Sequence, residues 1–141
     1  MIRVTRKLEF SAAHFYYNPN FSEEENRRVF GKCANRHGHG HNYVLEVTVA
    51  GEPDRATGMV LDLKELKDIL QREVGDRMDH RHLNYEVPEL AGKIPTCENI
   101  AAAIWRLLEP KITRGRLDRV RLYESPDLFV ECAADPSGAQ G

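Results

Sequence analysis

Three histidines alternate with two glycines from His37 to His41, and this segment runs directly into an alternating apolar stretch. From Tyr43 to Val49 the odd-numbered positions are apolar, and polar side chains interrupt the even-numbered ones. This period of two predicts a half-buried β-strand over residues 42–50. Since residues i and i+2 of a strand point to the same face, His39 and His41 can aim both imidazoles at one point.

Such a pair of imidazoles indicates a metal site. Neutral imidazoles held on one face are typical ligands of zinc, and the glycines between them let a metal or substrate approach the backbone closely. The alternative is a flexible His/Gly loop without function, because a short histidine-rich tract is only a compositional hint. The rest of the chain must decide between these two interpretations.

Length and charge limit the fold and the partners of the chain. Its 141 residues fit one ordinary domain, and we expect that domain over residues 1–133, followed by a loose C-terminal tail over residues 134–141. A net charge of −2 gives no reason to expect nucleic acid or an anionic membrane as a partner. No apolar run approaches the length of a membrane span or a signal peptide. Three widely spaced cysteines argue against a disulfide framework and for a reducing, cytoplasmic compartment.

Two kinds of apolar periodicity alternate along the chain. Spacings of three and four after Asp62 and after Thr96 predict two helices, each capped by that residue. Ser22 and Glu25 form a capping box for a short helix inside the long connection 11–40. The predicted strands cover residues 2–10, 42–50, 59–61, 117–124 and 128–132. This order predicts an α+β fold, an antiparallel β-sheet with two helices packed on one face.

Two further residues bear on the metal hypothesis. A catalytic zinc site needs three protein ligands and one open position. His14 is the best third ligand, because it follows the first predicted strand, although a histidine without a role is the alternative. Cys33 is either a fourth ligand, which would make the site closed and structural, or a base or nucleophile beside the metal. An inert buried thiol is the third possibility for this residue.

Carboxylates stand at two more candidate positions. In Asp79-His80, the aspartate can orient or charge an imidazole that shuttles protons, although adjacent residues seldom face each other and a solvated loop is the alternative. Glu124 ends an alternating strand, where a carboxylate can clamp the N–C–N edge of a fused heterocycle through two hydrogen bonds. An ordinary charge at a strand end is the alternative there.

Six motifs in a fixed order resemble the 6-pyruvoyltetrahydropterin synthase family, which includes the 6-carboxytetrahydropterin synthases of queuosine biosynthesis. The resemblance covers nearly the whole chain, roughly residues 8–130. Its motifs are Phe10-Ser11-Ala12-Ala13-His14, Cys33 to Tyr43, Gly58 to Lys67, Asp79-His80 with Leu83-Asn84, Pro95 to Asn99, and Tyr123-Glu124. Each motif is weak by itself, but all six in this order are highly specific.

The resemblance implies a role for each candidate residue and a particular assembly. The implied ligands of a Zn²⁺ cofactor are His14, His39 and His41. The implied catalytic residues are Cys33 as the base, with Asp79 and His80 completing its proton relay. The implied pterin contacts are Thr96 and Glu124. The implied fold is the tunnelling fold, or T-fold, in which trimers close their sheets into barrels. Two trimers would then stack into a homohexamer with active sites between subunits.

The implied reaction is that of a zinc-dependent lyase on 7,8-dihydroneopterin triphosphate, which loses triphosphate to give 6-pyruvoyltetrahydropterin. The queuosine enzymes start similarly but cleave the side chain, releasing acetaldehyde and triphosphate. Because His37 creates a second HGH motif, Cys33 precedes one motif by four residues, as in the queuosine branch, and the other by six. The strand register favours His39 and His41 as ligands and thus the six-residue spacing of the pyruvoyl branch. Two further alternatives are a pterin-binding relative without lyase activity and a non-enzymatic zinc-stabilised module with Cys33 as fourth ligand.

Overall fold

Five strands form a single sheet in the order β3-β1-β2-β4-β5 in the computed structural model, which describes residues 1–136. The strands are β1 (Ile2–His14), β2 (His39–Gly51), β3 (Arg81–His82), β4 (Arg116–Ser125) and β5 (Leu128–Ala133). All neighbouring strands are antiparallel except β3, which runs parallel to β1. The predicted α+β class is confirmed, with one short parallel strand added to the sheet.

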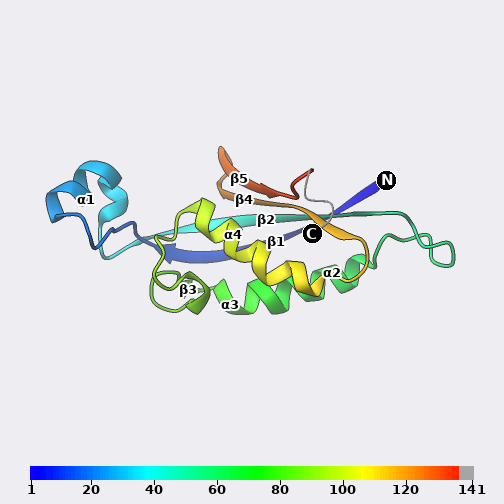
Figure 1. The fold of residues 1–141 in the computed structure, drawn as a ribbon. Coiled ribbons are helices and arrows are strands. Elements are labelled where there is room, and N and C mark those ends of the chain that lie inside the picture. Colours follow the sequence, from blue (N-terminus) through cyan, green and yellow to red (C-terminus); the bar gives the residue numbers. More distant parts are fainter. Residues whose placement is uncertain (137–141) are drawn as a thin grey trace.

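The helices fall into two groups relative to this sheet. In Figure 1, α2 (Leu63–Leu70), α3 (Asp76–Met78) and α4 (Cys97–Leu108) lie along one face of the sheet, as predicted. A π-helical turn, η2 (Gln71–Gly75), joins α2 to α3. The short helix α1 (Glu23–Phe30) lies beyond one end of the sheet. Three 3₁₀ turns complete the chain: η1 (Gly31–Ala34), η3 (Pro88–Leu90) and η4 (Glu109–Lys111).

The helix starts follow the capping residues that the sequence predicted. The Asp62 carboxylate accepts a hydrogen bond from the Lys64 amide, and the Thr96 hydroxyl accepts one from the Asn99 amide. The Ser22 hydroxyl accepts from the Glu25 amide in the same way at α1. Each of these bonds satisfies an amide that the first helical turn leaves without a backbone partner.

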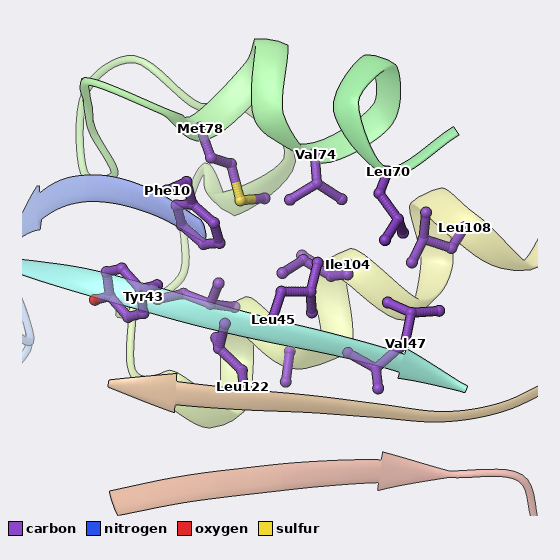
Figure 2. Close-up of a cluster of buried hydrophobic side chains, with 14 of the residues drawn as sticks. Phe10, Tyr43, Leu45, Val47, Leu70, Val74, Met78, Ile104, Leu108 and Leu122 are labelled. Atoms are coloured by element: carbon purple, nitrogen blue, oxygen red, sulfur yellow. The ribbon is translucent and has the colours of Figure 1, made fainter. Parts of the chain in front are cut away.

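The hydrophobic core lies between the sheet and the two helical segments. Figure 2 shows Leu70, Val74 and Met78 of the α2–α3 segment and Ile104 and Leu108 of α4 reaching toward the strands. The sheet contributes the inward residues Phe10 of β1, Tyr43, Leu45 and Val47 of β2, and Leu122 of β4, all of them buried. The apolar side chains that recur every second residue in the strands therefore pack against those that recur every three or four residues in the helices, in one apolar layer.

The strand predicted over residues 59–61 is wrong. These residues lie in a loop in which the Asp54 amide donates to the Met59 carbonyl, and the structure assigns them no strand pairing. Val60 and Leu61 are nevertheless buried against the core. The apolar run therefore reflects packing directly before the Asp62 helix cap, not pairing with a neighbouring strand.

The predicted ends of the first two strands and the predicted start of the C-terminal tail can be compared with the structure. β1 and β2 are longer than predicted, because they pair with each other over the whole span from Ile2 with Gly51 to His14 with His39. β5 ends at Ala133, and the predicted loose tail over residues 134–141 falls mostly on residues 137–141, which lie outside the described residues. The division into a domain and a tail therefore stays a prediction. Within residues 1–136, no helix is both long and apolar enough to cross a bilayer.

Candidate metal centre

Four side chains with metal-binding groups converge at one end of the helix-covered sheet face. They come from three neighbouring strands: His14 ends β1, His39 and His41 open β2, and Glu124 lies near the end of β4. One ligand atom of each side chain lies within 4.8 Å of those of the other three. Imidazole nitrogens and a carboxylate oxygen at such spacing can share a single metal ion.

The register between β1 and β2 brings the three histidines together. His14 pairs with His39, and Ala12 pairs with His41, so all three imidazoles lie on one face of the sheet. The Nε2 atoms of His14 and His39 are 3.1 Å apart. The Nε2 atom of His14 also lies 3.5 Å from Oε1 of Glu124.

His14 is held in one tautomer by the chain segment that precedes α4. Its Nδ1 atom lies 2.8 Å from the carbonyl oxygen of Pro95 and donates to it, so Nε2 presents a lone pair to the cluster. The residue is fully buried. Burial lowers the pKa of His14 to about 4, against the Pro95 hydrogen bond and together with the charges of His39 and His41. The imidazole is therefore neutral at neutral pH, as a metal ligand must be.

His41 carries the polar atom of the site that most clearly fits a metal ion. Its Nε2 atom is buried and has no hydrogen-bond partner within residues 1–136, although it lies 2.8 Å from Oε1 of Glu124. These two atoms are close enough for a hydrogen bond but are poorly aligned for one. A misaligned hydrogen bond is weak, so Nε2 of His41 counts as unpaired. Burial lowers the pKa of His41, and the Glu124 carboxylate opposes that shift. A buried neutral nitrogen facing a carboxylate is a donor set that suits Zn²⁺.

Cys33 lies in η1, between α1 and the histidine segment. It is partly buried, and its carbonyl oxygen accepts a 2.7 Å hydrogen bond from the Tyr16 amide. Among the described residues, its thiol does not belong to the group whose ligand atoms lie within 4.8 Å of one another. His37 is exposed and also lies outside that group.

Asp79 and His80 face each other, contrary to the expectation for adjacent residues. His80 has a φ angle of 62°, and its Nδ1 atom lies 3.0 Å from Oδ1 of Asp79. The Ser11 amide donates to the same carboxylate, and the His80 amide donates to the Ser11 carbonyl. The Ser11 bond is the largest cause that lowers the pKa of Asp79. Hydrogen bonds to Ser11 therefore fix this pair against β1, and the lowered pKa keeps the Asp79 carboxylate ionised.

The Asp79–His80 pair lies beside the candidate metal centre, at an exposed position. His80 has 83% of its side chain exposed, and no hydrogen bond or ion pair joins it to Cys33 within the part of the chain that the structure describes. His41 and His80 both line a hollow of about 420 Å³. A metal-ligand candidate and the relay candidate thus border one space that opens to the surface.

The two predicted pterin contacts have different surroundings. Glu124 lies among the histidines, so its carboxylate can serve either as a metal ligand or as a clamp beside the metal. Thr96 caps α4 through its hydroxyl, directly after the Pro95 carbonyl that orients His14. The sequence analysis predicted Thr96 as a helix cap and as a pterin contact. It did not predict that the carbonyl of the preceding Pro95 orients His14.

Two tyrosines of the site were also missed. Tyr43 is fully buried, and its hydroxyl lies 3.2 Å from Nδ1 of His14. Burial, followed by the charge of Glu124, raises the pKa of Tyr43. Burial also raises the pKa of Tyr16, together with Glu124 and Cys33. The signal that could have identified Tyr43 is its place two residues after His41, on the same face of the predicted strand. Tyr16 follows the first predicted strand and belongs to none of the six motifs, so the sequence held no such signal for it.

Comparisons with known proteins give a consistent result. The family model described as 6-pyruvoyl tetrahydropterin synthase matches residues 3–135. The chain is 44% identical over 128 residues to the 6-pyruvoyl tetrahydrobiopterin synthase of Pongo abelii, covering 91% of this chain and 88% of the relative. It is 31% identical over 152 residues to the 6-carboxy-5,6,7,8-tetrahydropterin synthase of Rickettsia felis, covering 93% and 99%. The solved structure of Caenorhabditis elegans 6-pyruvoyl tetrahydropterin synthase matches with a TM-score of 0.89 and 35% identity, covering 95% of this chain and 96% of that one.

These matches test the resemblance drawn from the six motifs. The family match spans almost all described residues, and the named relatives are alike in sequence over nine tenths of this chain. The predicted resemblance and the predicted lyase-type enzyme class are confirmed. The chain belongs to the 6-pyruvoyl tetrahydropterin synthase family.

Proposed function

We propose that the protein is a zinc-dependent lyase that acts on 7,8-dihydroneopterin triphosphate and eliminates triphosphate to give 6-pyruvoyltetrahydropterin. The observation that carries this proposal is the convergence of His14, His39 and His41 around a buried, unpartnered Nε2 atom. The names of the relatives agree with it, since the one at 44% identity is a 6-pyruvoyl tetrahydrobiopterin synthase. The three free cysteines fit the predicted reducing, cytoplasmic compartment.

The three histidines would hold Zn²⁺, and Glu124 would grip the pterin beside it. The ion, when bound, supplies Lewis acidity toward the side-chain oxygens of the substrate. Neutral His14, fixed by the Pro95 carbonyl, would offer its Nε2 lone pair to the ion. We assign Glu124 to the pterin, because a catalytic zinc site keeps one position free of protein ligands. Thr96, at the start of α4, would contribute the second contact to the ring.

Cys33 would take a proton from the side-chain carbon of the substrate and return it to a neighbouring carbon. A second carbon-bound proton would then leave, and the electron pair that it leaves behind would expel triphosphate from the adjacent carbon, so that triphosphate carries the negative charge away. Asp79 would hold His80 in the orientation that receives or supplies this proton, as their 3.0 Å contact supports. The buried cluster nearby would exclude water from the reacting carbon.

The placement of His80 supports a site shared between subunits. Its side chain is 83% exposed and forms no hydrogen bond or ion pair with Cys33 within residues 1–136, so the relay would complete the site of a neighbouring copy. Within residues 1–136, β5 and most of β1 have one side without a paired strand. Closure of such edges into trimeric barrels, stacked as a homohexamer, would satisfy their free amides and carbonyls.

A second candidate product is 6-carboxytetrahydropterin. The relative from Rickettsia felis carries that name at 31% identity, and the four-residue spacing from Cys33 to His37 is typical of the queuosine branch. Its reaction would release acetaldehyde as well as triphosphate. The pyruvoyl product is favoured here because the relatives named for it are more similar.

Incubation of the zinc-loaded protein with 7,8-dihydroneopterin triphosphate tests the proposal. We expect triphosphate release and a pterin whose mass is that of the pyruvoyl compound. Acetaldehyde together with the carboxy compound would reassign the product. Absence of triphosphate release would contradict the lyase proposal and leave a pterin-binding protein.

A Cys33→Ala variant separates the lyase from a zinc-stabilised structural module. For a lyase, the variant keeps its zinc and its melting temperature and loses turnover, because the base is gone. For a structural module with Cys33 as a ligand, zinc content and thermal stability fall together. Zinc content and melting temperature should therefore be measured on the same preparation as turnover.

A further inference from the structure

Tyr16 joins the metal centre to the cysteine segment. Its ring lies edge-on to the ring of His14, with centroids 5.1 Å apart and an interplanar angle of 76°. On its other side it makes a similar contact with Phe30 at the end of α1, with centroids 5.9 Å apart. Its amide donates a 2.7 Å hydrogen bond to the Cys33 carbonyl. One residue thus contacts a ligand candidate and fixes the backbone of the proposed base.

The hydroxyl of Tyr16 is unengaged, unlike those of two nearby tyrosines. The Tyr43 hydroxyl is buried against His14, and the Tyr17 hydroxyl donates to Glu23. The Tyr16 hydroxyl has no hydrogen-bond partner in residues 1–136, and the side chain is only partly buried. A phenol that is half enclosed and left without a partner is free to bond a ligand.

The surroundings of this phenol are the groups that the proposed reaction uses. The pKa of Tyr16 is raised by burial first, and then by the charges of Glu124 and Cys33. The pterin clamp Glu124 and the base Cys33 therefore lie near enough to Tyr16 for their charges to act on its phenol. The phenol is a neutral donor at neutral pH, as any tyrosine with an ordinary or raised pKa is.

We propose that Tyr16 is a further catalytic residue of this site, whose hydroxyl donates a hydrogen bond to the side-chain oxygen of the substrate between the metal ligands and Cys33. This inference rests on the proposed function. When Cys33 removes the carbon-bound proton, negative charge develops on the neighbouring oxygen. A fixed neutral donor stabilises that charge more than the ground state, which lowers the barrier to turnover.

A purely structural role is the competing explanation, since the ring packs between His14 and Phe30. Tyr16→Phe separates the two, because it keeps the ring, both ring contacts and the amide bond to Cys33, and removes only the hydroxyl. We expect kcat to fall about 100-fold, the effect of removing one donor to a developing oxyanion. Zinc content and melting temperature should stay at the wild-type values.

Tyr17→Phe is the matched control. It removes a neighbouring hydroxyl that donates to exposed Glu23, and it keeps the ring that lies under the Arg36 guanidinium. Its kcat should equal that of the wild type. A Tyr16→Leu variant adds the structural measurement: it removes the ring, so its melting temperature falls as well as its kcat.

The outcomes are distinct. Loss of kcat in Tyr16→Phe, with zinc and stability retained and Tyr17→Phe unaffected, supports the proposal. Wild-type kcat in Tyr16→Phe, with a loss confined to the melting temperature of Tyr16→Leu, overturns it and leaves a packing residue. An inert wild-type protein overturns the proposed lyase function itself, and this inference with it.

Discussion

The two ends of one row of side chains on β2 differ in chemistry but not in geometry. At one end Leu45, Val47 and Val49 are fully buried and pack under the helices. At the other end His39 and His41 continue the same row, on the same face, and meet His14 and Glu124 instead of helix residues. Tyr43 lies between the two ends, stacked on Phe10 and touching His14 with its hydroxyl.

The candidate metal centre is therefore an extension of the hydrophobic core along β2. The strand alternation that delivers leucine and valine to the helices also delivers imidazoles to one point. Burial by the adjoining core keeps His14 neutral, which is the charge state that a metal ligand requires. Substitutions at the histidine end of β2 should therefore lower zinc content, whereas substitutions at its apolar end should lower the free energy of unfolding.

The largest effect is expected at the metal end. His39→Ala removes one of three imidazoles while leaving the apolar part of the row intact. We expect turnover to be abolished and zinc content to fall well below one ion per chain, because a catalytic site with two protein ligands holds zinc weakly. Elemental analysis of the purified variant and a turnover assay check this. Full zinc content in the variant would contradict the proposed ligand set.

Leu45→Ala tests the apolar end of the same row. Leu45 is fully buried, so its truncation leaves a cavity and should lower the free energy of unfolding by about 2–5 kcal/mol. Urea unfolding measures this loss. Zinc content should stay at one ion per chain at temperatures where the variant is folded. A parallel loss of metal would show that the two ends are not separable.

Acid should destabilise the metal-free protein through its buried imidazole. The folded-state pKa of His14 is about 4, against 6.5 for an ordinary histidine. The stabilising contribution is complete above pH 6.5 and is lost as the pH falls to about 4, because only the unfolded chain binds the proton in that window. The slope is at most about 1.4 kcal/mol per pH unit for this group. Urea unfolding of chelator-treated protein between pH 4 and 7 checks it, with His14→Gln as the control that should flatten the slope.

Much of this arrangement was predictable from local patterns. The alternation after His41, the caps Asp62 and Thr96, and the pair of ligand candidates His39 and His41 all came from short stretches of sequence. Each depends on neighbours a few residues away, where geometry is nearly fixed by secondary structure. The C-terminal end of β1 was missed because Ala12 and Ala13 favour no strand by themselves and are extended only by pairing with β2.

The features that the sequence did not predict depend on strand pairing between distant residues or on an unusual backbone conformation. The apolar run at residues 59–61 cannot reveal whether a partner strand exists, so it was mistaken for a strand. The positive φ of His80 brings it against Asp79, and no rule of sequence spacing predicts that conformation for a histidine. The position of Glu124 among the histidines follows from the register of β4 on β2, which includes an irregularity at Thr48 and Val49.

Glu124→Gln sharpens the boundary between metal ligand and pterin clamp. Glutamine keeps the size of the side chain but removes its charge. If Glu124 grips the pterin, zinc content stays at one ion per chain and KM rises about 10- to 100-fold, as expected for the loss of a charged hydrogen bond. Zinc analysis and steady-state kinetics check both quantities. A fall in zinc content with this variant would instead assign the carboxylate to the metal.

The smallest effect is expected from Thr96→Ala, where the helix end and the metal end meet. The Thr96 hydroxyl caps α4 through the Asn99 amide, and the carbonyl of the preceding Pro95 orients His14. Loss of the cap should lower the free energy of unfolding by about 1 kcal/mol. Thr96→Ser keeps a capping hydroxyl and should restore that stability. A rise in KM that serine also corrects would mean that the hydroxyl reaches the pterin as well, whereas an unchanged KM in Thr96→Ala would contradict the predicted pterin contact and leave Thr96 as a cap alone.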